Sequence, residues 1–445
     1  MLDKKAVYVT LGCKLNFAET SSLGDRLEAV GVRRAARGEK ADVCVVNTCT
    51  VTETSSHKCR QAINRAMREN PDALMVVMGC YAQMAAREIA AMTGVDLVID
   101  MEHKAHAAEM IIERLQGSRV ENQESRVESQ ESRVKGQSSM PFVPSCSRGE
   151  RTRFFLKVQD GCDYFCTYCV IPFARGRSRN GSVADIVKQA EGAVTQGGKE
   201  IVITGVNIGD FGKSTGETFF DLIRALDKVE GVERYRISSI EPNLLTEEII
   251  DFCVESRRFM PHFHIPLQSG SDEVLRLMHR RYDTELFASR VDYIKKVMPD
   301  CFIGVDIIVG TRGETDELFE ESFAFASKID VSQFHVFSYS ERPGTAALRI
   351  PYKVTEKVKH ERSQRLIALS EQKRKNFYAS HIGQVRPVLT EHSHAGLAAK
   401  GFTDNYIHVE VDAAAGVQPD NTVVNYRLTG FNEDKTALMA TTIEH

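Results

Sequence analysis

Two absences narrow what this 445-residue chain can be. No run of residues comes near the roughly eighteen apolar side chains that a membrane-spanning helix needs, so no membrane segment is expected. The start, Met1-Leu2-Asp3-Lys4-Lys5, leads into a short strand pattern and not into the apolar core of a signal peptide, so we expect a cytoplasmic protein. Tryptophan is also absent, but this excludes no class of protein.

The 11 cysteines are an odd number in a chain without an export signal. In a reducing compartment, metal binding or catalysis is a more common use of cysteine than a disulfide. A hydrophobic content of 42% and a charged content of 27% are those of a soluble globular protein. The length predicts roughly two to four domains. The net charge of −4 decides neither for nor against a nucleic-acid partner.

Three cysteines have a Cys-X3-Cys-X2-Cys spacing in a loop that directly follows an apolar strand expected at 154–158. Soft sulfur ligands favour iron–sulfur clusters, zinc or Cu(I). Structural zinc sites normally take four protein ligands, and no fourth Cys or His lies close by in the sequence. A four-iron cluster held by three thiolates leaves one iron open for catalysis. The spacing therefore favours an iron–sulfur cluster at Cys162, Cys166 and Cys169 over zinc or cysteines that merely pack.

The first 116 residues alternate strand and helix patterns, which predicts a doubly wound parallel α/β domain. Strands are expected at 6–10, 42–47, 74–78 and 97–99, and helices at 17–30, 55–69, 83–92 and 103–115. Cys13, Cys49 and Cys80 each follow one of these strands, at the edge where open α/β sheets bind ligands. Three buried structural cysteines are the competing interpretation. Their shared position predicts a second three-thiolate cluster, with Gly12 and Gly79 allowing close backbone approach.

The alternation resumes after residue 151 and predicts a complete or partial barrel of six β/α units. Strands are expected at 154–158, 200–204, 234–238, 262–265, 302–308 and 333–337. Polar strand ends at 204–209, 241–242, 266–271 and 310–314 predict a pocket for a polar cofactor beside the three-cysteine loop. The remaining cysteines have no partners at ligand spacing and are expected to fill core or surface positions: Cys44, Cys59, Cys146, Cys253 and Cys301.

Composition predicts where the domains end. Residues 118–138 hold a seven-residue repeat with one valine per unit, too few for a coiled-coil seam, so a solvated linker is expected. The end of the chain shows short strand patterns separated by turns, which predicts a small β-barrel. The expected boundaries are an N-terminal domain at 1–117, a linker at 118–147, a barrel domain at 148–378 and a C-terminal domain at 379–445.

Two basic segments are candidates for RNA contact. Residues 351–375 contain eight Lys or Arg and three Glu, which is either a solvated helix face or a phosphate-contacting surface. The segment after the three-cysteine loop carries a second basic patch. The C-terminal domain is acidic, with four Lys or Arg and eight Asp or Glu from residue 380 onward, although RNA-binding domains are normally basic. The candidates for RNA contact are Arg175, Arg177, Arg179, Lys353, Lys357 and Arg362.

Two cysteine triplets, on an α/β domain and then on a barrel, resemble the radical S-adenosylmethionine (SAM) methylthiotransferases. That family joins an N-terminal cluster domain, a radical-SAM barrel and a C-terminal TRAM domain. The motifs that carry the resemblance are Thr-Leu-Gly-Cys13-Lys-Leu-Asn, Val-Val-Asn-Thr-Cys49-Thr-Val-Thr, Met-Gly-Cys80-Tyr-Ala-Gln, Gln-Asp-Gly-Cys162 through Pro172, and Pro266-Leu-Gln-Ser-Gly-Ser271. Thr50-Val51-Thr52 most resembles the MtaB-type subgroup, which converts N6-threonylcarbamoyladenosine at position 37 of tRNA to its 2-methylthio form. The MiaB and RimO groups differ at these residues.

The resemblance implies two 4Fe-4S clusters and SAM as cofactors. Cys162, Cys166 and Cys169 would hold the cluster that binds SAM, and Cys13, Cys49 and Cys80 the auxiliary cluster that carries the transferred sulfur. Around SAM we would expect Tyr168, Gly205, Asn207, Gln268, Ser269, Val309 and Gly310. One SAM would serve as radical source and another as methyl donor, with adenosine 37 in the anticodon loop of tRNA as target. The electron and sulfur donors are not given by the sequence, and a monomer is expected.

Two features depart from the family pattern, although the residues after Cys49 still favour an RNA substrate. Where the family usually has Gly-Phe-Pro-Gly-Glu-Thr, this chain has Gly310-Thr311-Arg312-Gly313-Glu314-Thr315, so we expect an altered loop with the site kept. The acidic C-terminal domain resembles the RimO group, which modifies a ribosomal protein. Two more roles stay open, namely MiaB-like modification of isopentenyladenosine and a non-enzymatic RNA-binding module that carries zinc or a cluster.

Overall fold

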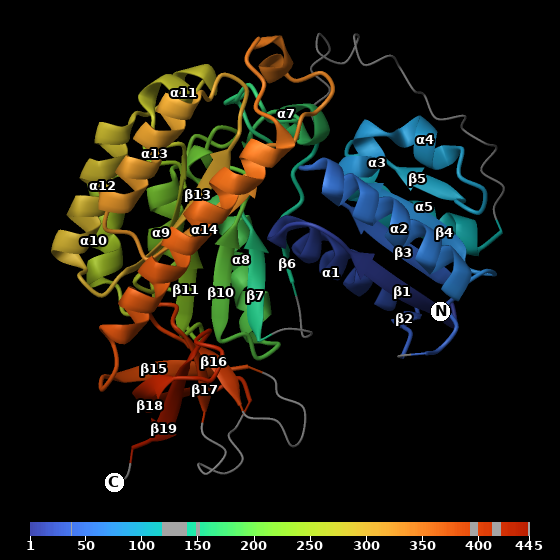
Figure 1. The fold of residues 1–445 in the computed structure, drawn as a ribbon. Helices are drawn as coiled ribbons and strands as arrows, with labels where there is room; N and C mark the ends of the chain where they lie inside the picture. The colour runs from blue at the N-terminus through green and yellow to red at the C-terminus, as the bar shows by residue number, and fades with distance from the viewer. Residues whose placement is uncertain (37, 118–139, 148–151, 392–398, 412–419, 444–445) are drawn as a thin grey trace.

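The chain forms two α/β units with parallel sheets and a small closed β-barrel (Figure 1). The structure, a computed structural model, describes residues 1–36, 38–117, 140–147, 152–391, 399–411 and 420–443. The seven-residue repeat expected at 118–138 lies outside these residues. None of the described helices combines the length and the apolar character that crossing a membrane requires.

The N-terminal unit is a five-stranded parallel sheet with helices on both faces, as predicted. Its strand order is β2-β1-β3-β4-β5. The strands are β1 (Lys4–Thr10), β2 (Val32–Arg34), β3 (Val43–Thr48), β4 (Leu74–Gly79) and β5 (Leu97–Ile99). The helices are α1 (Lys14–Glu28), α2 (Glu53–Glu69), α3 (Cys80–Met84), α4 (Ala86–Ala90), η1 (His103–His106) and α5 (Ala107–Leu115). One apolar cluster packs α1 and α5 on one face, and a second packs α2 and α4 on the other.

The central unit is a partial barrel of six parallel strands. They are β7 (Arg153–Lys157), β10 (Glu200–Thr204), β11 (Arg234–Ile237), β12 (His262–Gln268), β13 (Phe302–Val309) and β14 (Gln333–Ser338). The halves β7-β10-β11 and β12-β13-β14 meet through isolated bridges that pair Tyr235 with Phe259 and Ser239 with His264. β6 (Ser145–Cys146) joins the outer edge antiparallel to β7, within the range expected to be linker. The domain boundaries otherwise stay a prediction.

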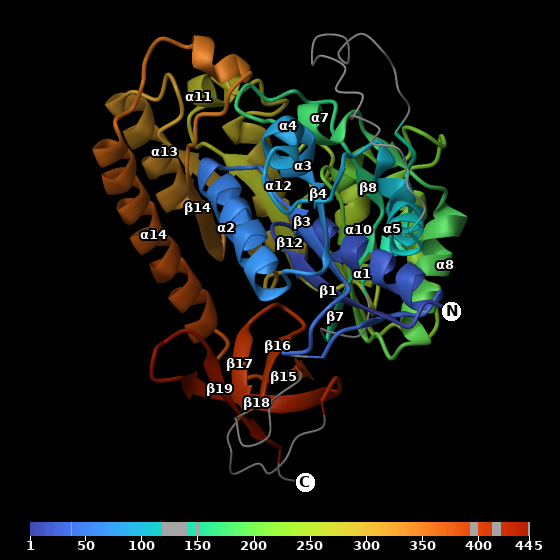
Figure 2. The same ribbon diagram turned by 90° about the vertical axis from the view of Figure 1, so that its right-hand side faces the viewer.

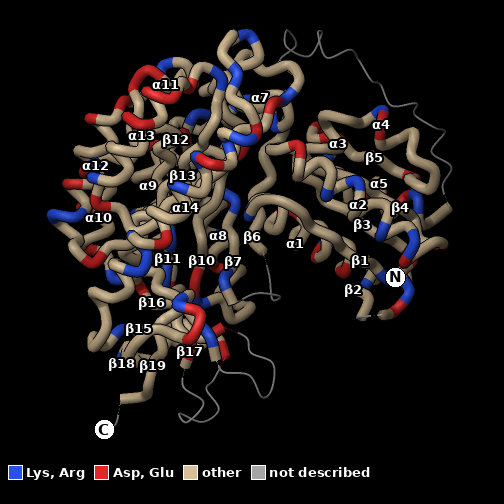
Figure 3. Tube along the Cα trace, viewed as in Figure 1, with Lys and Arg blue, Asp and Glu red and all other residues tan. Residues whose placement is uncertain are grey.

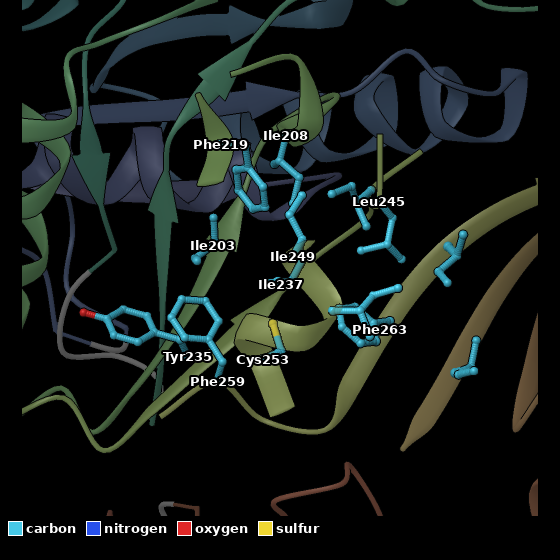
Figure 4. Packing of buried hydrophobic residues seen from close by; sticks show 14 of the residues in the cluster. Ile203, Ile208, Phe219, Tyr235, Ile237, Leu245, Ile249, Cys253, Phe259 and Phe263 are labelled. Carbon is cyan, nitrogen blue, oxygen red and sulfur yellow. The ribbon is translucent and has the colours of Figure 1, made fainter. Parts of the chain in front are cut away.

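Helices cover the outside of this barrel. They are α7 (Ile171–Arg175), α8 (Val183–Val194), α9 (Phe219–Leu226), α10 (Glu247–Glu255), α11 (Asp272–Leu277), α12 (Thr284–Val297), α13 (Asp316–Lys328) and α14 (Glu356–Ala379), with single turns η2 (Ile208–Asp210) and η3 (Ala346–Arg349). The main apolar cluster lies between these helices and the strands. Figure 4 shows Cys253 among its side chains, where Tyr235 stacks on Phe259 at 5.2 Å.

The alternation of side chains along each strand leaves a polar inner face. Outward positions such as Ile203 and Val305 belong to the apolar cluster, so their neighbours along the strand point inward. The charged and imidazole side chains of the inner face are Arg153, Lys157, Glu200, Arg234, Arg236, His262, His264, Asp306 and His335. The strands of the barrel thus present a charged inner face.

The C-terminal unit is a closed barrel of β15 (Val385–Thr390), β16 (Lys400–Thr403), β17 (His408–Val411), β18 (Val423–Phe431) and β19 (Leu438–Thr442). It lies across the end of the central barrel opposite α7 (Figure 1). Arg234 donates to the carbonyls of Phe402 and Pro387, and Arg236 to those of Asp404 and Thr403, at 2.8–3.0 Å. The fold class predicted from the sequence, including the TRAM-like barrel, is confirmed.

The N-terminal unit lies beside the open side of the central barrel (Figure 2). α1 contacts β6 and β7, and α3 contacts α7. Ala18 and Phe17 of α1 pack on Phe155 and Val202, both on the inner face of the strands. The edge that carries Cys13, Cys49 and Cys80 is therefore turned toward the barrel that carries the other three cysteines.

Candidate active site

The backbone of the barrel's cysteine loop is fixed by contacts that need a glycine. Gly161 has φ = 71°, and a Cβ there would lie 2.0 Å from the Arg177 carbonyl oxygen. The Cys162 amide donates to the Gly176 carbonyl at 3.1 Å, and the Thr167 amide bonds the Met278 carbonyl at 3.1 Å. The loop is thus tied at its start to the segment after α7 and in its middle to the end of α11.

Each sulfur of this loop accepts one hydrogen bond. The donors are the Tyr164 amide to Cys162 at 3.4 Å, Nη1 of Arg280 to Cys166 at 3.1 Å and the Ile171 amide to Cys169 at 3.4 Å. Burial, with a smaller effect of Cys166, raises the pKa of the Cys162 thiol to about 11 and that of Cys169 to about 12. A metal centre bound to this loop would supply the positive charge that makes these thiols thiolates.

The second triplet lies at the carboxyl edge of the N-terminal sheet, as predicted. Cys13 is exposed at the N-cap of α1, Cys49 follows β3, and Cys80 begins α3. Gly12 has φ = 98°, and a Cβ there would lie 2.6 Å from Cβ and 2.9 Å from Sγ of Cys49. Burial, with smaller effects of Cys80 and Cys13, raises the pKa of the Cys49 thiol to about 12. The three cysteines therefore lie along the same edge of the sheet.

Of the five remaining cysteines, Cys59 has a contact that the sequence did not reveal. All five are buried, in agreement with a packing role. Cys59 in α2 also accepts a hydrogen bond from the Cys49 amide at 3.2 Å and lies 3.3 Å from the Cys49 carbonyl oxygen. Cys59 therefore helps to fix the backbone of a proposed ligand. Spacing along the chain carries no signal of this contact.

Neither triplet is arranged as a ready-made metal site within the part of the chain that the structure describes, since no three Cys, His, Asp or Glu side chains there have such geometry. Their donor chemistry nevertheless fits an iron–sulfur cluster. Each offers three soft sulfur donors at one strand edge, and Gly12 and Gly161 keep the neighbouring backbone within reach.

Buried polar atoms without partners lie at the strand ends near the barrel loop. Gln268 has φ = 67°, a left-handed conformation that is strained for a residue with a side chain, and its Oε1 has no hydrogen-bond partner among the described residues. Both amide atoms of Asn207, which is 3% exposed near the Tyr164 hydroxyl, also have no partner within hydrogen-bond geometry among the described residues. Buried polar groups without partners are costly, so these two amides fit a polar ligand such as SAM.

The other residues expected around SAM have mixed placements. Tyr168 is within 3.5 Å of Arg280 through its hydroxyl, and Gly205 leaves no room for a Cβ beside Gln159. Ser269 accepts a hydrogen bond from the Ser271 amide and so shapes the turn. Val309 points into the apolar cluster on the helix side, which does not fit a side-chain contact with SAM.

The altered loop after β13 keeps its two family residues in contact. The Gly310 amide donates to the Glu314 carboxylate, which also accepts from Arg362 at 2.8 Å. Gly310 has φ = 74°, and a Cβ there would lie 2.3 Å from Cγ of Lys359. Arg312, one of the unusual residues, bonds Glu341 at 2.9 Å. The loop is therefore altered in composition while its Gly310–Glu314 contact is retained.

Two polar groups near the site were missed by sequence reasoning. Arg280, which bonds Cys166, also pairs with the partly buried Glu241. On the inner face of the strands, Nε2 of His264 is 2.8 Å from Oδ1 of Asp306, and its ring stacks on His335 at 5.1 Å. The alternation of side chains along the strands could have indicated that His264, Asp306 and His335 point inward. Arg280 lies in a turn, where periodicity carries no information.

The candidates for RNA contact divide into buried and exposed side chains. Arg175 and Arg362 are buried and fully engaged in ion pairs, which does not fit the RNA contact expected for them. Arg179 pairs with Asp160 and is 13% exposed. The exposed members are Arg177, at 75%, Lys353, at 56%, and Lys357, at 86%. In the view of Figure 3, Lys and Arg are interspersed with Asp and Glu over the barrel helices.

Comparison with known proteins matches both halves of this arrangement. Residues 5–100 match the model of an uncharacterized protein family, UPF0004, and residues 156–326 match the radical SAM superfamily. The chain is 41% identical over 406 residues to the threonylcarbamoyladenosine tRNA methylthiotransferase MtaB of Bacillus subtilis, covering 90% of this chain and 88% of the relative. It is 36% identical to the protein of the same name from Aquifex aeolicus, covering 91% and 96%.

Two more distant proteins are similar to this chain, one in sequence and one in fold. A tRNA-2-methylthio-N(6)-dimethylallyladenosine synthase of Zymomonas mobilis is 34% identical, covering 86% of this chain and 85% of the relative. Among solved structures, the radical SAM methyltransferase TsrM from Kitasatospora setae is similar in fold, with a TM-score of 0.57 at 15% identity, covering 78% of this chain and 74% of that one. With two cysteine triplets on the matching domains, and relatives above 30% identity along nearly its whole length, the chain belongs to the radical-SAM methylthiotransferase family.

Proposed function

We propose that the protein transfers a methylthio group to C2 of N6-threonylcarbamoyladenosine at position 37 of tRNA. The observation that carries this proposal is the 41% identity to an MtaB methylthiotransferase over 90% of the chain. The dimethylallyladenosine-modifying relative matches at 34% identity. We further propose that the protein acts as a monomer in the cytoplasm, where its tRNA substrate is found.

The six cysteines are the groups that would hold the cofactors. Cys162, Cys166 and Cys169 would hold one 4Fe-4S cluster together with SAM, and Cys13, Cys49 and Cys80 would hold the other. When bound, these cofactors supply a radical able to attack the inert C2–H bond and the sulfur that replaces the hydrogen. No acid or base among protein side chains can supply either.

The chain's own residues bind and shield the site. The unpartnered amides of Asn207 and Gln268 would bind the polar groups of SAM. The Arg280–Glu241 ion pair fixes the side chain that donates to Cys166. The C-terminal barrel covers the end of the central barrel opposite the cysteine loop.

The exposed aromatic and cationic side chains beside the cysteine loop suit a single-stranded RNA loop. Phe165 and Phe173 are 39% and 44% exposed, and their rings meet edge to face at 6.2 Å. The Arg177 guanidinium lies 4.7 Å from the Phe165 ring centre. Unpaired bases stack on such surfaces, and removing one from a loop costs less than flipping a paired base.

Nucleoside mass spectrometry of tRNA tests the proposal. A strain that lacks the protein should lose 2-methylthio-N6-threonylcarbamoyladenosine and regain it with the wild-type gene, but not with Cys13→Ala or Cys162→Ala. Cys253→Ala, which changes a core cysteine, is the matched control. Loss of the isopentenyl product would instead support the MiaB-like function. An unchanged nucleoside profile with a missing modification on a ribosomal protein would support the RimO-like one.

A further inference from the structure

Arg175 connects the two cysteine triplets. It is the last residue of α7, the helix that begins directly after the loop of Cys162 to Cys169, and it is 1% exposed. Its Nε donates a hydrogen bond to Sγ of Cys80 at 3.2 Å. Arg175 therefore follows Cys169 by one short helix along the chain, and its side chain bonds a sulfur of the other triplet.

Every N–H of the Arg175 guanidinium has an acceptor. Besides Cys80, Nη1 donates to Asp160 at 2.9 Å and to Glu19 at 3.1 Å. Nη2 donates to Asn16 at 2.7 Å and to Glu19 at 3.3 Å. The planar, five-donor guanidinium is the side chain that can satisfy such a set from a fixed position. Three of these acceptors belong to the N-terminal unit, so the contact fixes that unit against α7.

The buried group around Arg175 carries more positive than negative charge. Glu19 is paired with Lys104 at 2.5 Å and with Lys157 at 2.8 Å, and Asp160 is paired with Lys157 at 2.8 Å and with Arg179 at 3.1 Å. The four cations are Arg175, Lys104, Lys157 and Arg179, and the two carboxylates are Glu19 and Asp160.

A surplus of two buried positive charges is costly unless negative charge balances it. Three thiolates at Cys13, Cys49 and Cys80 would bring that charge to the same place. Hydrogen bonds to sulfur and the nearby net charge are what set the reduction potential of an iron–sulfur cluster. A cluster gains negative charge on reduction, so neighbouring cations and N–H donors favour its reduced form.

We propose that Arg175 is a positioning residue that holds the auxiliary triplet against the barrel and, through its bond to Cys80 and the surrounding cations, raises the reduction potential of the cluster bound there. This rests on the proposed assignment of a second cluster to Cys13, Cys49 and Cys80. It gives the role of a residue that the sequence had suggested for an RNA surface.

The test is a redox titration of reconstituted full-length protein followed by electron paramagnetic resonance. Arg175→Met removes the donor and the charge, and should shift the auxiliary signal to a more negative potential while leaving the SAM-binding cluster unshifted. Arg175→Lys keeps the positive charge but loses the planar guanidinium donors. Its auxiliary potential should therefore lie between those of Arg175→Met and the wild type. Arg224→Met, an exposed change on α9, is the matched control and should leave both potentials unchanged. Auxiliary potentials equal to wild type in Arg175→Met would overturn the proposal.

Lys104→Met keeps the test decisive if Arg175→Met cannot retain its cluster. Lys104 belongs to the surplus of charge but donates to Glu19 and Asn47 and not to a cysteine. Its loss should shift the auxiliary potential in the same direction by a smaller amount, and an unchanged potential contradicts the charge argument. Iron analysis of the wild-type protein tests the second cluster separately from the role of Arg175. A wild-type content of about four irons, where two clusters require about eight, would refute the second cluster itself.

Discussion

The Arg342 guanidinium donates a hydrogen bond of 2.7 Å to the hydroxyl of Thr50, the residue that follows Cys49. It also donates to Glu53 at 2.8 Å and to Ser56 at 3.3 Å. Arg342 follows β14 in the barrel, whereas all three acceptors belong to the N-terminal unit. Two arginines of the barrel domain thus hold the sheet edge that carries the auxiliary triplet. Arg175 bonds it at Cys80, and Arg342 bonds it next to Cys49.

Replacing Arg342 should loosen this second contact. Arg342→Met leaves the buried Thr50 hydroxyl and the Glu53 carboxylate without their cationic donor, which costs about 1–3 kcal/mol. We expect a lower midpoint in thermal unfolding of the full-length protein. Arg349→Met, in the exposed turn η3 of the same segment, should leave the midpoint unchanged. Equal midpoints for both variants would contradict a role for Arg342 in docking.

Gly12→Ala should remove the auxiliary cluster alone. The new Cβ would lie 2.6 Å from Cβ of Cys49, at a residue with φ = 98°. We expect reconstituted protein to bind about four irons instead of about eight while still cleaving SAM. Gly38→Ala is the matched control, because its φ is 83° but a Cβ there meets nothing within 4 Å. If both variants bind full iron, the close approach at Gly12 is not required.

Glu314 should give the stability of the protein a specific pH dependence. Burial raises the pKa of its carboxyl from 4.5 to about 7, against the opposing effect of Arg362. A raised folded-state pKa adds stability that is complete below the unfolded value and is lost as pH rises through 7. The wild type should lose up to about 3 kcal/mol relative to Glu314→Gln between pH 5 and pH 8.

Chemical unfolding of both proteins across this pH range measures the difference. Glu255→Gln, at the exposed end of α10, is the control and should follow the wild type at every pH. A Glu314→Gln curve parallel to that of the wild type would show that the Glu314 carboxyl keeps its ordinary pKa in the folded protein.

Replacing the exposed lysines before and within α14 should have a different effect from replacing the buried arginine of the same segment. If Lys353 and Lys357 contact phosphate, replacing each by Met should reduce the salt dependence of tRNA binding by about one charge. Arg362→Met should lower stability instead, because it breaks the pairs with Glu314 and Asp316. Lys228→Met, an exposed change after α9, is the control. If the salt dependence of tRNA binding is unchanged in the Lys353 and Lys357 variants, this surface is solvated and does not contact phosphate.

The longer strands of the two parallel sheets were predictable because periodicity and position point the same way. β3, β4, β10, β12 and β13 lie where apolar runs end in glycine, cysteine or polar residues. The short strands β2 and β16 were missed, since three or four residues such as Val32–Arg34 show no clear alternation. Their pairing is set by neighbouring strands.

The roles of individual arginines could not be predicted, because charge counts do not show burial. Arg175, Arg177 and Arg179 look alike in sequence, yet one bonds a cysteine, one is exposed and one pairs with Asp160. Which of them turns inward depends on carboxylates far away in the chain, such as Glu19. The same reason explains why α14 appeared as a basic surface although Arg362 is enclosed.

Two arginines of the central barrel, Arg234 and Arg236, attach the C-terminal domain through its main-chain atoms. Arg234 and Arg236 bond four carbonyl oxygens of that domain, and no side chain of the domain takes part in those four bonds. Any sequence that preserves the backbone path offers the same acceptors. The surface of the C-terminal domain can therefore change its charge over evolution, even to an acidic composition, without weakening these four bonds.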